Sequence, residues 1–83
     1  MAMPSLSADF QKGLKAFNDG DFQTAIREWT PVAEQGDAIA QYNLGLLYEK
    51  GRGVTPDHKI AFRWYSRAAE DGIPQAQLNL GEL

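Results

Sequence analysis

The stretch Gly45–Gly72, GLLYEKGRGVTPDHKIAFRWYSRAAEDG, connects two copies of one sequence motif. AIAQYNLG at residues 38–45 returns as PQAQLNLG at residues 74–81, which is 36 positions further along the chain. Self-similarity at a period of this length is the sequence signature of proteins built from stacked supersecondary units. The sequence therefore predicts a repeat protein, and Gly45–Gly72 belongs to its one complete unit.

The same period extends toward the N-terminus. Residues of one unit recur 36 positions later in the next: Ala25, Ala33, Glu34 and Gly36 return as Ala61, Ala69, Glu70 and Gly72, and Trp29 returns as Tyr65. Matches further upstream have a shift of only 32: Phe10, Gly13 and Leu14 correspond to Tyr42, Gly45 and Leu46. The four extra residues fall in the glycine-rich segment Gly51–Asp57, which reads as a loop.

Each unit is predicted to form a pair of amphipathic helices. In the central unit, apolar residues recur at helical spacing in two segments: Ala40, Leu44, Leu47 and Tyr48, then Ala61, Trp64, Tyr65, Ala68 and Ala69. Such spacing places these side chains on one face of a helix. Glycines such as Gly13 and Gly45 would let helices approach closely, while Trp29 and Tyr65 fill the space between them.

Residues with special backbone preferences mark the expected helix ends. Glycine adopts the left-handed conformation without a side-chain clash, so helices should stop at Gly36, Gly51 and Gly72. Asp57 is predicted to be an N-cap, and Pro74 falls in the first turn of the last helix. Pro31 lies inside a predicted helix and predicts a kink or an early break there.

These patterns predict an all-α fold, an α/α solenoid of antiparallel helix pairs with about two repeats and one extra C-terminal helix. The expected domain spans residues 7–83, with repeats at 7–37 and 38–73 and a partial repeat at 74–83. Residues 1–6 are expected to be a disordered segment or an expression scar.

The central and last units share a pattern of spaced glycine, alanine and aromatic residues: Leu44, Gly45, Tyr48, Gly51, Gly53, Val54, Asp57, Ala61, Trp64, Tyr65, Ala68, Ala69, Gly72, Ala76, Gln77, Leu80 and Gly81. This pattern resembles a known family, the Sel1-like repeat, which is a relative of the tetratricopeptide repeat. The resemblance covers Ala38–Leu83, whereas Asp9–Gly36 resembles the shorter tetratricopeptide-like version. In such families the first helix of every repeat lines a concave surface. The resemblance thus implies a groove for a protein or peptide partner.

Composition restricts the class of partner. The 83 residues are 43% apolar and 23% charged, as expected for one small folded domain, and the net charge of -3 disfavours binding to nucleic acid. The chain has no cysteine, and it has no apolar run of about 18 residues for insertion into a membrane. The compartment stays open: periplasmic or secreted if a leader was removed, otherwise cytoplasmic.

A set of eight residues is predicted to line the groove, on a helical face rotated from the Ala/Gly/Leu core face: Phe10, Leu14, Phe17, Tyr42, Leu46, Glu49, Leu78 and Glu82. An aromatic and aliphatic stripe with acidic edges suits a peptide or helix laid in a groove. The alternative for each single side chain is packing between helices. Together the eight residues favour a binding surface, so the leading function is that of a scaffold or adaptor without turnover.

The last helix offers a second candidate surface. Leu78, Leu80 and Leu83 are expected to form an apolar ridge that no following helix covers. A homodimer would bury this ridge, which makes self-association the alternative function. The ridge fits the cut end of a longer solenoid equally well.

No catalytic, metal or cofactor site is expected. His58, the single histidine, follows an N-cap and has no serine or carboxylate motif placed to make it a general base. Asp19 and Asp21 flank Gly20 in a short turn, but the ligand series of a calcium loop is missing. Turn and capping roles account for both aspartates.

One charged pattern stands out on the helix after Asp57. Lys59, Arg63 and Arg67 recur every four residues and form a basic stripe. Such a stripe is usually a solvated outer face. We expect it to pair with Glu70 or Asp71.

Overall fold

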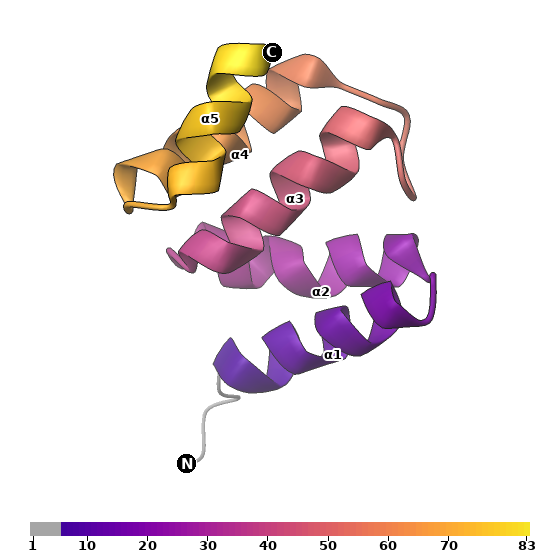
Figure 1. The fold of residues 1–83 in the computed structure, drawn as a ribbon. Coiled ribbons are helices and arrows are strands. Elements are labelled where there is room, and N and C mark those ends of the chain that lie inside the picture. Colours follow the sequence, from indigo (N-terminus) through magenta and orange to yellow (C-terminus); the bar gives the residue numbers. More distant parts are fainter. Residues whose placement is uncertain (1–5) are drawn as a thin grey trace.

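Figure 1 shows the computed structural model, which describes residues 6–83. These residues form five helices and no strand. The helices are α1 (Leu6–Asn18), α2 (Phe22–Glu34), α3 (Ala38–Lys50), α4 (His58–Glu70) and α5 (Pro74–Glu82). The all-α prediction is confirmed. Of the tail expected at residues 1–6, Leu6 begins α1, and the rest lies outside the described residues.

Aspartate side chains begin three of the helices. Asp21, Asp37 and Asp57 each accept a hydrogen bond from the backbone N–H three residues on, at 3.2, 2.9 and 3.0 Å respectively. Each bond satisfies one of the amide groups that a helix leaves unpaired in its first turn. The N-cap predicted at Asp57 is thereby confirmed, and α5 begins with Pro74 at its first position, also as expected.

Glycines follow the helix ends. Gly36, Gly51 and Gly72 have φ angles of 107°, 69° and 90°, values in the left-handed region that glycine adopts most readily. The early break expected at Pro31 does not occur, because α2 continues through it to Glu34. Pro31 lies on the exposed side of α2, where water can bind the Arg27 carbonyl that lacks its usual amide partner.

The helices pack as a stack of antiparallel neighbours. The substantial helix contacts are between α1 and α2, α2 and α3, α3 and α4, and α4 and α5. Figure 1 shows the chain rising from α1 at the bottom to α5 at the top, in a body measuring 42 × 26 × 17 Å. Contacts made mainly between neighbours along the chain are characteristic of a solenoid.

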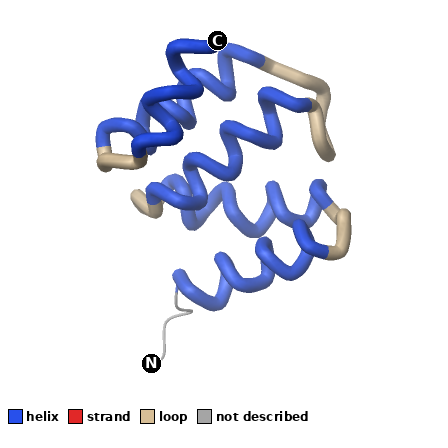
Figure 2. The backbone as a smooth tube through the Cα atoms, viewed as in Figure 1, coloured by secondary structure: helices blue, strands red, loops and turns tan. Residues whose placement is uncertain are grey.

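The α3–α4 connection holds the four extra residues of the central unit, and Figure 2 shows it as the longest loop. Gly53, with a φ of 77°, brings this loop against the start of α2. A Cβ atom at Gly53 would lie 2.8 Å from the backbone of Phe22 and Gln23. The loop is therefore packed onto the preceding repeat.

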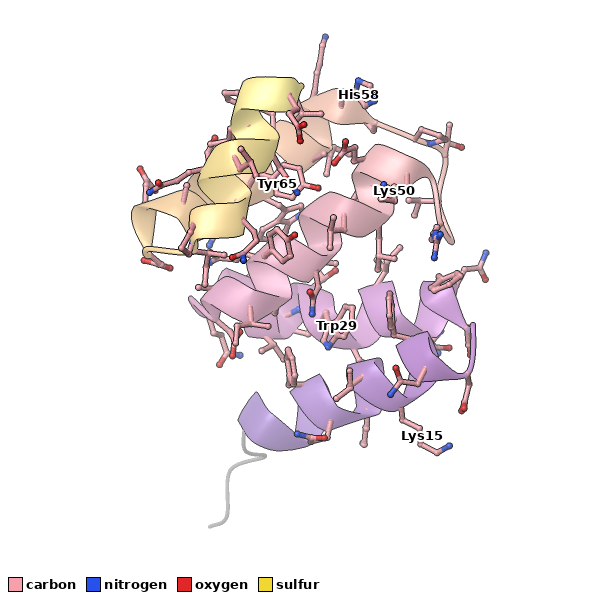
Figure 3. The ribbon with its side chains drawn as sticks, in the orientation of Figure 1. Lys15, Trp29, Lys50, His58 and Tyr65 are labelled. Carbon is pink, nitrogen blue, oxygen red and sulfur yellow. The ribbon has the colours of Figure 1, made fainter. Side chains whose placement is uncertain are left out.

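The core is divided into two clusters, each with one large aromatic side chain. Trp29, 1% exposed, lies in a cluster with Val32, Leu44 and Leu47, and Tyr65, with no exposed surface, lies in a second cluster with alanines of α4 and α5. Figure 3 shows both rings inside the stack. Burial of large apolar side chains supplies most of the free energy that favours folding.

Both rings lie against a glycine of the preceding helix. A Cβ atom at Gly13 would overlap the indole of Trp29, and one at Gly45 would lie 2.5 Å from Cδ1 and Cε1 of Tyr65. The absence of a side chain at these two positions lets the helices approach, as the sequence predicts. The Trp29 indole N–H also donates to the Phe10 carbonyl at 3.1 Å.

A glutamine joins each unit to the next. Gln41 Nε2 donates to the Ala33 carbonyl at 3.0 Å, and Gln77 Nε2 donates to the Ala69 carbonyl at 3.4 Å. Donors and acceptors are both 36 residues apart, so the repeat in sequence is also a repeat of the hydrogen bond. The bond ties the first helix of one unit to the last turn of the helix before it.

Candidate functional site

The predicted groove residues of α1 pack against another helix and remain partly exposed. Phe10, Leu14 and Phe17 are half-buried and pack against the cluster that contains Trp29. The ring centroids of Phe10 and Phe17 each lie 5.7 Å from that of Trp29. These three side chains therefore contribute to stability and keep part of their surface exposed.

The predicted groove residues of α3 likewise pack against the core and remain partly exposed. Tyr42 and Leu46 are half-buried and pack against the Tyr65 cluster, and the Tyr42 and Tyr65 ring centroids are 5.8 Å apart. Glu49 accepts a hydrogen bond of 2.6 Å from the Tyr65 hydroxyl. Burial raises the pKa of the Tyr65 hydroxyl well above its usual range, and the bond to Glu49 acts in the same direction.

The groove residues of α5 are much more accessible. Leu78 is 66% exposed and Glu82 is also exposed. Neither side chain belongs to a core cluster. They extend the apolar and acidic character of the α1 and α3 residues onto the last helix.

One hollow brings predicted groove residues from two repeats together. It has a volume of about 130 Å³ and is lined by Phe17 of α1, Leu46, Leu47 and Lys50 of α3, and Arg52 of the following loop. Lys50 and Arg52 are exposed, and the Arg52 guanidinium lies 5.5 Å from the centre of the Phe22 ring. The hollow therefore has apolar walls and a basic edge, whereas the sequence drew attention to acidic residues.

A larger hollow lies at the open end of the stack, between α4 and α5. It has a volume of about 620 Å³ and is lined by His58, Lys59, Phe62, Arg63, Leu80 and Leu83. Figure 3 shows His58 beside the C-terminal end of α5. Two of the three ridge leucines thus line one hollow, while Leu78 lies outside it.

Phe62 is a residue of this end that the sequence patterns did not single out. Its side chain is 52% exposed although it is large and apolar. The sequence could have predicted this exposure, because Phe62 follows the core residue Ala61 and is thus rotated by about 100° from the core face of its helix. An aromatic residue at that position, inside a stripe of basic residues, has no role in the core.

The basic stripe is exposed as expected, but its pairing differs from the prediction. Arg67 lies over the Trp64 ring, 4.9 Å from its centre. Over residues 10–83, the ion pair that the structure contains is Lys15–Asp19 at 3.0 Å, and none joins the stripe to Glu70 or Asp71. At an exposed site a guanidinium group gains about as much from an aromatic face as from a solvated carboxylate, so the Trp64 ring competes with the acidic residues for Arg67.

Within the described part of the chain, none of the helices combines the length and the apolar character needed to span a bilayer. The longest of them has 13 residues.

Comparison with known proteins relates this chain to one family. The Sel1 repeat family model matches residues 38–73, which contain α3 and α4. A crystal structure of a Sel1 repeat protein from Oxalobacter formigenes is 34% identical and superposes with a TM-score of 0.84, covering 95% of this chain and 34% of that one.

Similar sequences occur in proteins from a bacterium, a plant and a yeast. An exopolysaccharide production negative regulator from Rhizobium leguminosarum is 32% identical over 87% of this chain, and the ERAD-associated E3 ubiquitin-protein ligase component HRD3A from Arabidopsis thaliana is 41% identical over 78%. Chitin synthase regulatory factor 3 from Schizosaccharomyces pombe is 46% identical over 61%. The chain spans 27%, 9% and 6% of these three proteins respectively.

Three findings indicate the same repeat architecture: the family model, the structural neighbour and the repeated contacts of Gly45 and Gln41. The resemblance predicted from the sequence is confirmed: residues 38–73 are a Sel1 repeat, and the chain folds as a Sel1-repeat protein.

Proposed function

We propose that this chain is a binding module that holds a peptide segment of a partner protein on the face formed by α1, α3 and α5, without turnover. The surface consists of the eight groove residues Phe10, Leu14, Phe17, Tyr42, Leu46, Glu49, Leu78 and Glu82. The observation that carries the proposal is the hollow in which Phe17 of one repeat and Leu46 of the next lie together. A site shared by two repeats exists only in the folded stack.

The chemistry of that hollow indicates the kind of segment it would take. Its volume of about 130 Å³ suits one aliphatic or aromatic side chain. The exposed cations Lys50 and Arg52 at its edge favour a carboxylate next to that side chain. We therefore expect segments that combine a bulky apolar residue with aspartate or glutamate.

The names of the relatives agree with a role in assemblies. They describe regulators of exopolysaccharide and chitin synthesis and a component of a ubiquitin ligase complex. A component of a ligase and a regulatory factor of a synthase each act together with another protein. For this chain, which spans a small part of each relative, a binding role is the common element that we carry over.

Selection from a peptide-display library tests the proposal and requires no identified partner. After selection on the immobilised chain, the best peptide is added to isotope-labelled protein, and the shifts of the backbone amide signals are mapped. The proposal predicts the largest shifts at Phe17, Leu46 and Lys50. Failure to select any peptide, or shifts concentrated away from α1 and α3, would contradict it.

Self-association through Leu78, Leu80 and Leu83 is the second candidate, favoured by the 66% and 37% exposure of Leu78 and Leu83. Light scattering over a wide concentration range measures the mass of the assembly directly. A dimer that Leu83→Glu dissociates would support this candidate. A monomer at all concentrations would eliminate it and leave the groove as the functional surface.

A further inference from the structure

Two consecutive residues of α3 turn to different sides of Leu46. Lys50 lines the hollow of about 130 Å³ together with Leu46 and Phe17 of α1. Glu49 lies outside that hollow and accepts the hydrogen bond of 2.6 Å from the Tyr65 hydroxyl of α4. The two side chains diverge because successive helical residues differ by about 100°. Leu46 lies between them, since it lines the hollow and also packs against the cluster that contains Tyr65.

The hydrogen bond from Tyr65 holds the Glu49 carboxylate in one position. Its donor belongs to a fully buried side chain, so the hydroxyl cannot move without disturbing the core. The length of 2.6 Å is typical of a hydroxyl that donates to a carboxylate, which is a strong class of hydrogen bond. The carboxylate is therefore oriented before any partner binds, and less conformational entropy is lost on binding.

The charge of Glu49 has no counter-ion in the fold. From residue 10 to the end of the described chain, no lysine or arginine forms an ion pair with Glu49. The Asn79 side chain of α5 also approaches the Tyr65 hydroxyl, but it is neutral. One oxygen of the half-buried carboxylate bonds to Tyr65, and the same part of the chain donates no hydrogen bond to the other oxygen. That second oxygen can accept a hydrogen bond from a ligand.

The surface beside this oxygen suits the side chain of lysine or arginine. Tyr42 and Leu46 lie on the same face of α3 as Glu49, seven and three residues before it, and both are half-buried. Their apolar surface can pack against the methylene groups of a long basic side chain whose charged end reaches Glu49. A cation bonded to a carboxylate forms a stronger hydrogen bond than a neutral donor does.

From the fixed position of Glu49, its free oxygen and the basic groups on the other side of Leu46, we propose that Glu49 selects partner segments that carry a lysine or arginine. This inference rests on the proposed function and adds an order of charges to it. The bound segment has its apolar residue in the hollow, a carboxylate near Lys50 and Arg52, and a basic residue near Glu49. Tyr65 is a positioning residue, because it acts through Glu49.

Two selections from one peptide-display library test the inference. The first uses the wild-type chain and the second uses Glu49→Gln, which removes the charge and keeps an oxygen that accepts from Tyr65. We expect the wild type to enrich peptides with lysine or arginine at a fixed spacing from the bulky apolar residue, on the side away from the aspartate or glutamate. Glu49→Gln should still enrich the apolar and acidic residues but lose the preference for the basic one.

Glu28→Gln is the matched control for these selections. Glu28 is half-buried like Glu49, but it belongs to α2 and lines none of the hollows. This variant should enrich the same peptides as the wild type. A general effect of lowering the negative charge of the chain would instead appear in both variants.

A double-mutant cycle then measures the contact itself. Fluorescence anisotropy gives the dissociation constants of the best wild-type peptide, and of the same peptide with glutamine in place of its basic residue, for the wild-type and Glu49→Gln chains. We expect each single change to weaken binding about tenfold, which is about 1.4 kcal/mol, and the two changes together to weaken it little further. In Tyr65→Phe, which keeps the ring, the peptide substitution should have a smaller effect, whereas a purely structural loss would weaken both peptides equally.

The outcomes distinguish this inference from the proposed function. Selected peptides with the apolar and acidic residues but no preferred basic residue would overturn the inference and leave the proposed function standing. Equal results for Glu49→Gln and Glu28→Gln, or additive effects in the cycle, would also overturn it. Failure to select any peptide on the wild-type chain would overturn both.

Discussion

The ring of Tyr65 lies so close to Gly45 that a single methyl group on this glycine would come within 2.5 Å of two ring carbons. Trp29 and Gly13 repeat the relationship one unit earlier. Each repeat of the fold is thus fixed by one aromatic ring seated on one glycine.

Gly45→Ala is expected to lower the free energy of unfolding by about 1–2 kcal/mol. Forcing an extra carbon into a packed core typically costs about 1–3 kcal/mol, and the higher helix propensity of alanine offsets up to about 1 kcal/mol of this. Urea denaturation followed by circular dichroism measures the change. Gly81→Ala is the matched control and should be neutral or slightly stabilising, because its Cβ meets nothing within 4 Å. Equal effects of the two substitutions would contradict this account of the packing.

Stability should fall at alkaline pH because of Tyr65. Burial, followed by the hydrogen bond to Glu49, raises the pKa of this hydroxyl in the folded chain, whereas in the unfolded chain it titrates at about pH 10. The unfolded state therefore loses the proton first, so the contribution of Tyr65 is complete below about pH 10 and declines as pH rises further.

Tyr65→Phe separates this effect from the titration of other groups. The variant should be less stable at neutral pH by about 1–2 kcal/mol, since a hydrogen bond to a carboxylate is lost. Its unfolding free energy should then change less with pH between about pH 9 and pH 11 than that of the wild type. Parallel pH profiles for the two proteins would show that the Tyr65 hydroxyl is not the responsible group.

Gln41 should tolerate an apolar side chain of the same shape. Its Nε2 donates to the Ala33 carbonyl, which also accepts from the Gly36 N–H at 3.0 Å. Its buried Oε1 has no hydrogen-bond partner among the described residues. Gln41→Met removes the unpaired oxygen together with one bond, so we expect a change of less than about 1 kcal/mol.

Gln41→Ala instead leaves a cavity and should destabilise the chain by about 2 kcal/mol. Gln77→Ala, at the equivalent exposed position, should change stability by less than about 0.5 kcal/mol. Chemical denaturation of the three variants provides the comparison. A large loss in Gln41→Met would mean that the Ala33 hydrogen bond outweighs the cost of the unpaired oxygen.

Asp57→Ala should destabilise the chain by about 1 kcal/mol, because the first turn of α4 loses the side chain that accepts from the Ile60 N–H. Asp57→Asn keeps a capping oxygen and should retain most of the stability. Thermal denaturation distinguishes the two substitutions. If asparagine and alanine were equally harmful, the negative charge of Asp57 rather than its capping bond would be the stabilising feature.

The fold was predictable from the sequence because its two determinants are local. The 36-residue period fixes which residues are equivalent, and the glycines at 36, 51 and 72 together with the aspartate at 57 fix where helices begin and end. The close packing of the Trp29 and Tyr65 rings against Gly13 and Gly45 was predictable, because each large side chain needs a small residue on the facing helix. Of the kink or early break predicted at Pro31, the break does not occur, because an exposed carbonyl in a packed helix can bind water in place of the missing amide.

The surfaces were harder to predict because they depend on how helices cross. Grouping Leu78 with Leu80 ignored a rotation of about 200° between them, since successive helical residues differ by about 100°. Helical geometry alone would have separated these two residues. The hollow that joins Phe17 to Leu46, and the position of Arg52 at its edge, depend on the spacing between α1 and α3, which no periodicity specifies.

The most direct test of peptide binding in the groove is the dissociation constant of the library-selected peptide for three proteins: the wild type, the Lys50→Glu/Arg52→Glu variant and the Lys12→Glu variant. Lys12 is also exposed but lines none of the hollows described above. We expect an acidic, apolar peptide whose affinity falls about tenfold or more, by about 1.4 kcal/mol, in the double variant and stays unchanged in Lys12→Glu. Equal affinity for all three proteins would contradict the proposal that the hollow between α1 and α3 is the binding site.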